Sequence, residues 1–297
     1  MFIKELTLKK FRSHHQSRFE FSPQTTIILG PNTSGKTNIL EAIFLLSVGK
    51  SFRAESERDM VEWKEEVSRI KGRIIDNTGP VDLEAMVTTG EVSGLKTQIK
   101  RFTVNGVVRR QIDFVGKLRV VLFWPEDLEL VTDSPTMRRR YLDFVLVQID
   151  REYRRSLLSY EKGLRQRNRL LEHIREGEAG RNQLLFWDQL LIKTGSYLTD
   201  ARQSYIEAIN ESDKPFGEFH LIYNHSYISA QRLSQYAEEE VAAASTLVGP
   251  HRDDLTFFEG KRDLSKFGSR GEQRLAVLWL KLAELEFLAV RGGERPV

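Results

Sequence analysis

Hydrophobic and polar positions alternate along the first third of the chain, which predicts short strands rather than helices. Apolar and β-branched residues recur at every second position, and turn residues separate the runs at 76–80 and at Asn105-Gly106. Two runs, 26–29 and 120–123, are continuously apolar, which is typical of buried strands. The predicted strands are 2–8, 19–21, 26–29, 68–74, 81–87, 100–104 and 120–123.

From about residue 135 the apolar positions follow helical spacing. Long helices are predicted over 137–176 and 183–210, with residues 176–180 as the elbow between them. A strand at 219–223 and helices at 233–244 and 269–290 follow. We therefore expect a sheet-based nucleotide lobe interrupted by a helical lobe. The expected divisions are 1–124 for the first part of the nucleotide lobe, 125–244 for the helical lobe and 245–297 for the second part of the nucleotide lobe.

The segment from Gly30 to Thr37 matches the phosphate-loop pattern G-x-x-x-x-G-K-[ST] at every required position. It stands between an apolar run and a helical pattern, which is the context that the motif needs. Glycines let the backbone curl so that its N–H groups surround an anion at a helix N-terminus. The expected ligand is a nucleoside triphosphate, ATP first, with Lys36 on the β- and γ-phosphates and the Thr37 hydroxyl on Mg²⁺. The predicted cradle is Gly30, Pro31, Asn32, Thr33, Ser34, Gly35, Lys36 and Thr37.

A second motif, residues 267–274, opens the last predicted helix. Ser269 is a good N-cap, and Glu272 completes a capping box. A Ser-x-Gly-x-Gln turn also presents a hydroxyl and backbone N–H groups to an anion. It resembles the signature motif of ABC-type ATPases, which closes over the γ-phosphate held by another subunit. The resemblance implies contacts in trans from Ser269, Arg270, Gly271, Glu272 and Gln273.

The composition is that of a globular protein: 297 residues, of which 40% are hydrophobic and 29% are charged. Neither a membrane-spanning run nor a secretory pattern is present, so a cytoplasmic location is expected. The absence of cysteine excludes disulfides, cysteine-ligated zinc and thiol catalysis. No histidine stands at metal-ligand spacing, and no residue is assigned a catalytic role.

Positive charge is concentrated between residues 138 and 175. Eleven Lys/Arg minus five acids leave +6 there, against +3 for the whole chain. Clustered cations of this kind favour contact with nucleic-acid phosphates; the alternative is a solvated helix face. The candidate DNA contacts are Arg138, Arg139, Arg140, Arg154 and Arg155.

Several further segments extend the resemblance over essentially the whole chain. They are 11–14, 38–43, 49–53, 123–128, 138–143, 249–255 and 268–274. Together with the two nucleotide motifs they resemble the RecF family of bacterial recombination mediators, which is related to the SMC ATPase heads. The resemblance implies an α/β fold, with an ABC-type P-loop ATPase head, a β-rich subdomain and a mostly helical second lobe.

The same resemblance implies how the protein works. It implies ATP- and Mg²⁺-dependent formation of a homodimer, and binding of duplex, gapped or single-stranded DNA. It also implies a role in DNA replication, repair and the SOS response through RecO and RecR partners, which load recombinase. Arg12, Ser13 and Asn38 are expected near the nucleotide, and Glu126 is expected as a metal contact.

The chain departs from the family pattern near its last residues. An aliphatic run that ends in paired carboxylates, the Walker B strand, is expected after residue 293 and is not in the sequence. Asp253 and Asp254 fit a strand-edge turn better than this pair. We therefore expect a C-terminally truncated chain that hydrolyses ATP poorly, because hydrolysis needs a carboxylate to hold Mg²⁺ and water. One alternative stays open: a nucleotide-binding interaction module without turnover. Another P-loop enzyme, such as a small-molecule kinase, is disfavoured because a kinase has no use for the signature helix.

Overall fold

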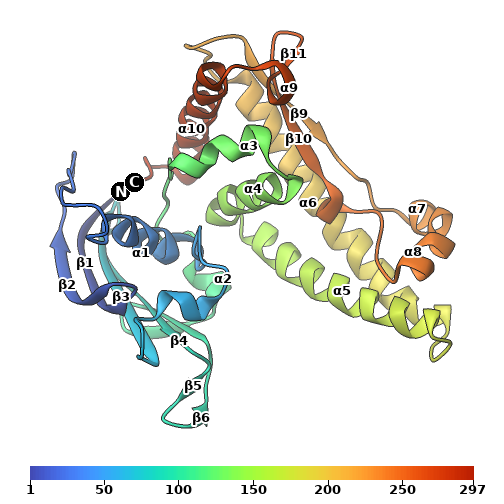
Figure 1. The fold of residues 1–297 in the computed structure, drawn as a ribbon, viewed down its shortest axis with the longest axis horizontal. Coiled ribbons are helices and arrows are strands. Elements are labelled where there is room, and N and C mark those ends of the chain that lie inside the picture. Colours follow the sequence, from blue (N-terminus) through green and yellow to red (C-terminus); the bar gives the residue numbers. More distant parts are fainter. The chain divides into compact units, whose positions relative to one another are not determined.

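The computed structural model describes residues 1–297 and separates into two compact units (Figure 1). Unit 1 comprises Met1–Leu122 and Leu288–Val297, and unit 2 comprises Phe123–Phe287. None of the helices combines the length and the apolar character that crossing a membrane requires. The fold is a mixture of helices and antiparallel sheets, in agreement with the predicted class.

Unit 1 is built on a six-stranded antiparallel sheet in the order β2-β1-β3-β4-β7-β8. The strands are β1 (Phe2–Phe11), β2 (His14–Glu20), β3 (Val67–Asp76), β4 (Gly79–Thr88), β7 (Lys100–Val104) and β8 (Val107–Arg109). A small hairpin, β5 (Glu91–Val92) and β6 (Leu95–Lys96), leaves the sheet between β4 and β7. Asn105 and Gly106 turn the chain between β7 and β8 with φ of 50° and 76°. The predicted strands 2–8, 68–74, 81–87 and 100–104 are confirmed; β7 has the predicted bounds, and β1, β3 and β4 are longer than predicted.

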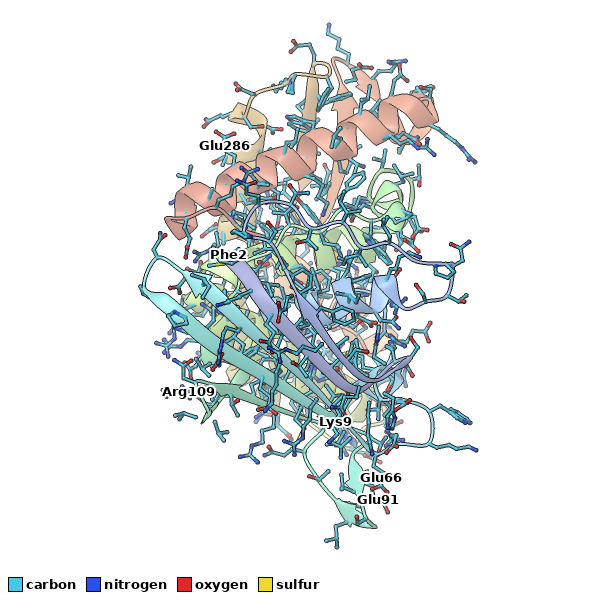
Figure 2. All side chains as sticks on the ribbon, turned by 90° about the vertical axis from the view of Figure 1, so that its left-hand side faces the viewer. Phe2, Lys9, Glu66, Glu91, Arg109 and Glu286 are labelled. Atoms are coloured by element: carbon cyan, nitrogen blue, oxygen red, sulfur yellow. The ribbon has the colours of Figure 1, made fainter.

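One face of this sheet is covered by helix α1 (Lys36–Val48). On β3, Ile70 and Ile74 point to the buried face, and a Cβ on Gly72 would lie 2.6 Å from Leu46 Cδ1 of α1. The opposite face of β3 carries exposed Arg69, Lys71 and Arg73. Figure 2 shows the strands of this sheet with all side chains drawn as sticks. The alternation therefore fixes which side receives the helix. A 3₁₀ turn, η1 (Glu57–Met60), and α2 (Gln111–Phe114) complete this unit.

Two predicted strands are wrong. Residues 26–29 form no strand, and Ile27 and Leu29 are 77% and 86% exposed. Residues 120–123 also form none; Val121 N donates to Val297 O at 2.9 Å, and Phe123 is exposed. An apolar, β-branched run becomes a strand only where a neighbour supplies ladder hydrogen bonds, and no strand lies beside 26–29 among these residues.

Unit 2 is mostly helical and contains one small sheet. Its larger helices are α4 (Pro135–Ile149), α5 (Arg151–Arg175), α6 (Leu185–Glu211) and α10 (Arg270–Gly292), which begins in this unit. The shorter helices are α3 (Glu129–Thr132), α7 (Ala230–Gln235), α8 (Ala237–Ala243), α9 (Leu264–Phe267) and the 3₁₀ turns η2 (Pro125–Leu128), η3 (Arg181–Leu184) and η4 (Pro250–Arg252). The strands are β9 (Phe219–Asn224), β10 (Asp254–Glu259) and β11 (Arg262–Asp263), paired in the order β11-β10-β9.

The helical hairpin of α5 and α6 turns at the predicted elbow, residues 176–180. The predicted helix 137–176 breaks once, because Asp150 accepts hydrogen bonds from Glu152 N and Tyr153 N at 2.8 and 2.9 Å and so caps α5. The predicted helix 233–244 is likewise divided, between α7 and α8. Strand β10 pairs with β9, so residues 245–287 pack with unit 2 although the sequence assigned them to the nucleotide lobe.

Candidate nucleotide site

The phosphate loop leads directly into α1, which begins at Lys36 with Gly35 as its N-cap residue. Thr33 and Gly35 have φ of 69° and 87°, which curls the backbone in front of the helix N-terminus. A Cβ on Gly35 would lie 2.6 Å from His14 Nε2 and 2.9 Å from Ser13 Oγ. Glycine is therefore required at position 35 both for its dihedral angle and for the close approach of the β1–β2 turn.

His14 belongs to this site, although it was not predicted as a site residue and only its segment, 11–14, carried the family resemblance. Its Nε2 lies 3.2 Å from the Gly35 carbonyl oxygen, and its Nδ1 lies 3.0 Å from Ser17 Oγ. The buried imidazole also packs edge-on against Phe19. It thereby holds the peptide between Gly35 and Lys36 in one orientation.

Lys36 and Thr37 stand where the motif needs them. The Lys36 ammonium donates to the carbonyl oxygens of Gly30 and Pro31 at 2.8 and 2.7 Å. Thr37, in the first turn of α1, is exposed. An ammonium and a hydroxyl beside curled backbone amides are a suitable donor set for a triphosphate and a hard cation such as Mg²⁺.

A buried carboxylate, Glu41 of α1, organises the residues beside the loop. It has no exposed surface and accepts hydrogen bonds from Arg12 at 2.7 and 2.9 Å, from Arg53 at 2.8 and 3.1 Å, and from Ser51 Oγ at 2.6 Å. Burial alone would raise the Glu41 pKa, but these hydrogen bonds outweigh it and hold the pKa below its ordinary value. Glu41 therefore stays ionised and fixes two guanidinium groups.

This cluster is continuous with the phosphate loop. Arg53 Nη2 also donates to Asn38 Oδ1, and Asn38 Nδ2 donates to Ser13 Oγ at 2.8 Å. The structure thus brings together the predicted residues Arg12, Ser13 and Asn38. Glu41 and Arg53 were missed as site residues, although both lie in segments that carried the family resemblance.

The signature segment forms the predicted cap of α10. Ser269 N donates to Glu272 Oε2 at 2.7 Å, and Glu272 N donates to Ser269 Oγ at 3.3 Å. The backbone hydrogen bond from Ser269, helped by Arg262, lowers the pKa of Glu272 to about 2. Ser269, Arg270 and Gly271 are exposed, and Gln273 Nε2 donates to the Leu264 carbonyl at 2.9 Å. The turn is rigid and presents its N-terminal residues to solvent.

The two acids of η2 differ in exposure. Glu126, the predicted metal contact, is exposed. Asp127 is buried, accepts from Trp124 N at 3.0 Å and lies 3.6 Å from Lys281 Nζ of α10. Of the two, Glu126 has the accessible carboxylate that a metal contact requires.

Most of the arginines predicted to contact DNA instead contact other residues of unit 2. Arg138 is buried, pairs with Asp254 at 2.6 and 3.0 Å and also donates to the Leu130 and Asp133 carbonyls. Arg139 donates to Asp253 O, and the Arg140 guanidinium lies 5.0 Å from the centroid of the Phe144 ring. Arg154 is half-buried, whereas Arg155 is exposed and pairs with Glu152 at 3.3 Å. The prediction of a DNA contact is therefore corrected for Arg138, whose donors are turned inward.

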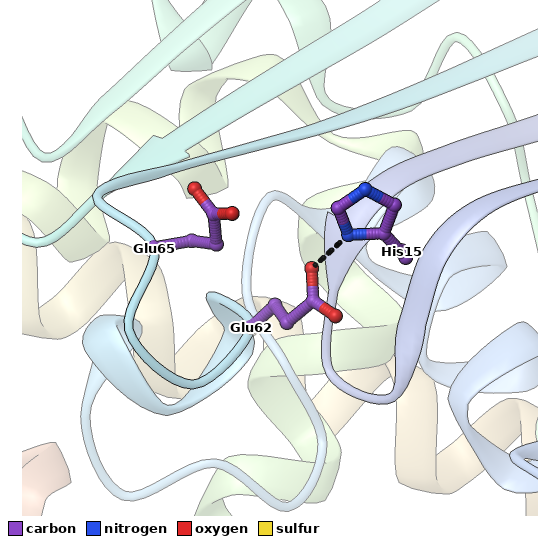
Figure 3. A group of neighbouring side chains, drawn as sticks. All are labelled: His15, Glu62 and Glu65. Carbon is purple, nitrogen blue, oxygen red and sulfur yellow. Dashed lines mark hydrogen bonds and ion pairs between the residues drawn. The ribbon is translucent and has the colours of Figure 1, made fainter.

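His15, Glu62 and Glu65 form a small group on the surface of unit 1 (Figure 3), and their potential ligand atoms lie within 4.8 Å of one another. His15 Nδ1 lies 3.0 Å from Glu62 Oε2, but Lys10 Nζ is 2.6 Å from Glu65 Oε2. The ammonium already neutralises that carboxylate, so we assign no metal to this group.

Comparisons with known proteins agree with the motifs. The model of the RecF/RecN/SMC N-terminal domain family matches residues 2–290. DNA replication and repair protein RecF of Lachnoclostridium phytofermentans is 36% identical over 310 residues, covering 100% of this chain and 84% of the relative. RecF of Chloroflexus aggregans is 37% identical over 332 residues, covering 100% of this chain and 85% of the relative. Among solved structures, the recombination mediator RecF bound to ATP has a TM-score of 0.91 and 31% identity, over 99% of this chain and 83% of that chain.

Proposed function

Because the chain belongs to the RecF/RecN/SMC N-terminal domain family, we propose that it is an ATP-binding DNA replication and repair protein. The observation that carries this proposal is the phosphate loop. Its positive-φ residues, the helix that starts at Lys36 and the surrounding Arg12, Ser13 and Asn38 form one contiguous polar network. The similarity to the RecF–ATP structure supports the same ligand.

In this proposal the backbone amides of residues 33–37 and the Lys36 ammonium hold the triphosphate. Mg²⁺ is held by the Thr37 hydroxyl, with Glu126 as a further candidate ligand. Arg12 adds positive charge at the edge of the site, where Glu41 fixes its guanidinium. Bound Mg²⁺ would neutralise phosphate charge.

The nucleotide is also proposed to join two copies of the chain. Residues 269–273 of the second copy cover the triphosphate, because a rigid, solvent-facing helix N-terminus is a suitable anion ligand. By function, rather than by contacts, residues 1–124 and 245–297 are proposed to form the ATPase head, and residues 125–244 the helical lobe. The dimer would bind DNA in the cytoplasm and act with RecO and RecR to load recombinase.

A complementation experiment tests this arrangement. Light scattering with Mg²⁺ and a non-hydrolysable ATP analogue measures the mass of wild type, Lys36→Ala and Ser269→Arg. Wild type is expected to dimerise and each variant alone to stay monomeric. A 1:1 mixture of the variants should recover dimers, because one of its two composite sites retains both Lys36 and Ser269. Failure of the mixture to dimerise while wild type does would overturn the arrangement in trans.

A second candidate, a nucleotide-binding interaction module without turnover, is favoured by one observation. Glu41, the acid that α1 places beside the loop, is fully occupied by Arg12, Arg53 and Ser51 and cannot orient water. ATP turnover with and without DNA separates the two candidates. Turnover stimulated by DNA supports the repair ATPase, whereas nucleotide binding with no turnover in either condition supports the module.

A further inference from the structure

The cations of helix α5 are divided between its two sides. Arg167 points inward, where it pairs with Asp188 and Glu240, each at 2.7 Å. The exposed positions of α5 carry six cations (151, 155, 162, 165, 169 and 175) and two acids (152 and 172), a net charge of +4. No carboxylate lies within ion-pair distance of Lys162, Arg165 or Arg169, whereas Arg155 has a single partner, Glu152.

Five of these cations form a straight row, which we call the basic stripe: Arg151, Arg155, Lys162, Arg165 and Arg169. Their spacings of four, seven, three and four residues place them on one face of an α-helix. At about 1.5 Å per residue the row is roughly 27 Å long. The helices that pack against α5, namely α4, α6 and α8, meet its other sides, where its buried residues lie.

Because an exposed helix face is usually polar, we compare the net charge of the exposed positions of α5 with that of the neighbouring helix α6. Its exposed positions carry one cation, Lys193, and three acids, Asp200, Glu207 and Glu211, a net charge of −2. Two adjacent helices of similar length and exposure thus differ by six charges. Solvation of an exposed helix face does not by itself require the excess of cations over acids that the exposed positions of α5 carry.

We propose that the basic stripe of α5 is the surface that binds the phosphate backbone of duplex DNA. This inference rests on the proposed function and names the surface for it. Lysine and arginine neutralise phosphates without reading sequence. Surfaces for single strands interleave cations with aromatic side chains on which bases stack. The exposed positions of α5 include no aromatic residue, and the one apolar residue among them is Leu158. The stripe therefore fits a duplex.

The test compares two variants with the same loss of charge. The stripe variant carries Lys162→Gln, Arg165→Gln and Arg169→Gln. The control carries Lys117→Gln, Lys193→Gln and Lys261→Gln, all exposed positions off the stripe. Fluorescence anisotropy measures binding to a duplex and to a single strand of equal length, from 50 to 200 mM salt. The dependence of log affinity on log salt should flatten by about 0.9 per lost contact, or about 2.7 in the stripe variant. Its duplex affinity near 0.1 M salt should fall about tenfold or more.

A gain of charge tests the same surface in the opposite direction. Leu158 is 48% exposed at the middle of the stripe, so Leu158→Arg should steepen the salt dependence by about 0.9. Leu185→Arg on exposed α6 is the matched control and should leave it unchanged.

The results separate two failures. Equal duplex binding by stripe variant and control, or a loss confined to the single strand, overturns the stripe alone. A wild-type protein that binds ATP analogue but no DNA at any salt overturns the proposed function together with the stripe. Retained nucleotide binding in both triple variants shows that a loss of DNA affinity comes from the surface.

Discussion

Replacing Glu41 by glutamine tests how far this buried carboxylate stabilises α1 and the residues beside the phosphate loop. Glu41→Gln keeps the shape of the side chain but removes the charge that two guanidiniums share. Breaking a buried ion pair by removing one partner typically costs about 3–5 kcal/mol. Arg12 and Arg53 retain side-chain exposures of 21% and 31%, so water can solvate part of the uncompensated charge. We therefore expect a loss near the lower limit, about 3 kcal/mol.

Native-state hydrogen exchange measures this loss locally, because opening free energies can differ between the elements of one protein. In Glu41→Gln the opening free energies of the α1 amides should fall by about 3 kcal/mol. The amides of α6 in unit 2 serve as the internal control, and their opening free energies should not change. A change in α1 below about 1 kcal/mol, which is typical of an exposed ion pair, would show that Glu41 contributes little to the stability of this helix.

Acid pH should reproduce the effect in the wild type. The folded-state pKa of Glu41 lies below the ordinary value of 4.5. Its contribution to stability is therefore complete above about pH 4.5 and is lost as the pH falls through the lower, folded value. The protection of α1 should fall over that window in the wild type, and this step should be absent from Glu41→Gln.

Three other predictions concern single side chains. Lys36→Ala should abolish detectable ATP binding in calorimetry. It should change thermal stability by less than about 0.5 kcal/mol, because the Lys36 ammonium bonds only to carbonyls of an exposed loop. A loss of ATP binding together with a loss of stability would contradict this. Arg202→Met should destabilise unit 2 by about 3–5 kcal/mol in urea unfolding, because it leaves the carboxylates of Asp143 and Asp253 without their buried partner; a loss under about 1 kcal/mol would assign the network little weight. Burial lowers the pKa of His251 from 6.5 to about 4. Between these pH values the unfolded chain therefore takes up a proton that the folded chain does not. The free energy of unfolding should fall as the pH drops from 6.5 towards 4, by at most about 1.4 kcal/mol per pH unit. Urea titrations should show a flatter pH dependence for His251→Gln, and an unchanged slope would exclude this histidine as the cause.

The phosphate loop and the α10 cap could be predicted because their requirements are local. Gly35 is needed for a positive φ, and Ser269 with Glu272 forms a box within one helical turn. The strands failed where pairing decides the outcome. Residues 26–29 have a strand's composition but no neighbour with which to form a ladder.

Charge counts along the sequence do not show which cations face solvent. Arg138 and Arg169 belong to the same basic block, yet Asp254 holds the first inside unit 2 and the second is exposed. Helical periodicity applied to α5 could have separated buried Arg167 from exposed Arg165 and Arg169. The partners of Glu41 could not be read this way, since Arg12 is 29 residues distant and reaches α1 only through the fold.

A crystal structure with Mg²⁺ and a non-hydrolysable ATP analogue would show whether the phosphate loop holds the nucleotide. We expect the amides of residues 33–37 to surround the β- and γ-phosphates, and the Lys36 ammonium to leave the Gly30 and Pro31 carbonyls and contact these phosphates. A triphosphate bound elsewhere, with Lys36 still on those carbonyls, would contradict this expectation.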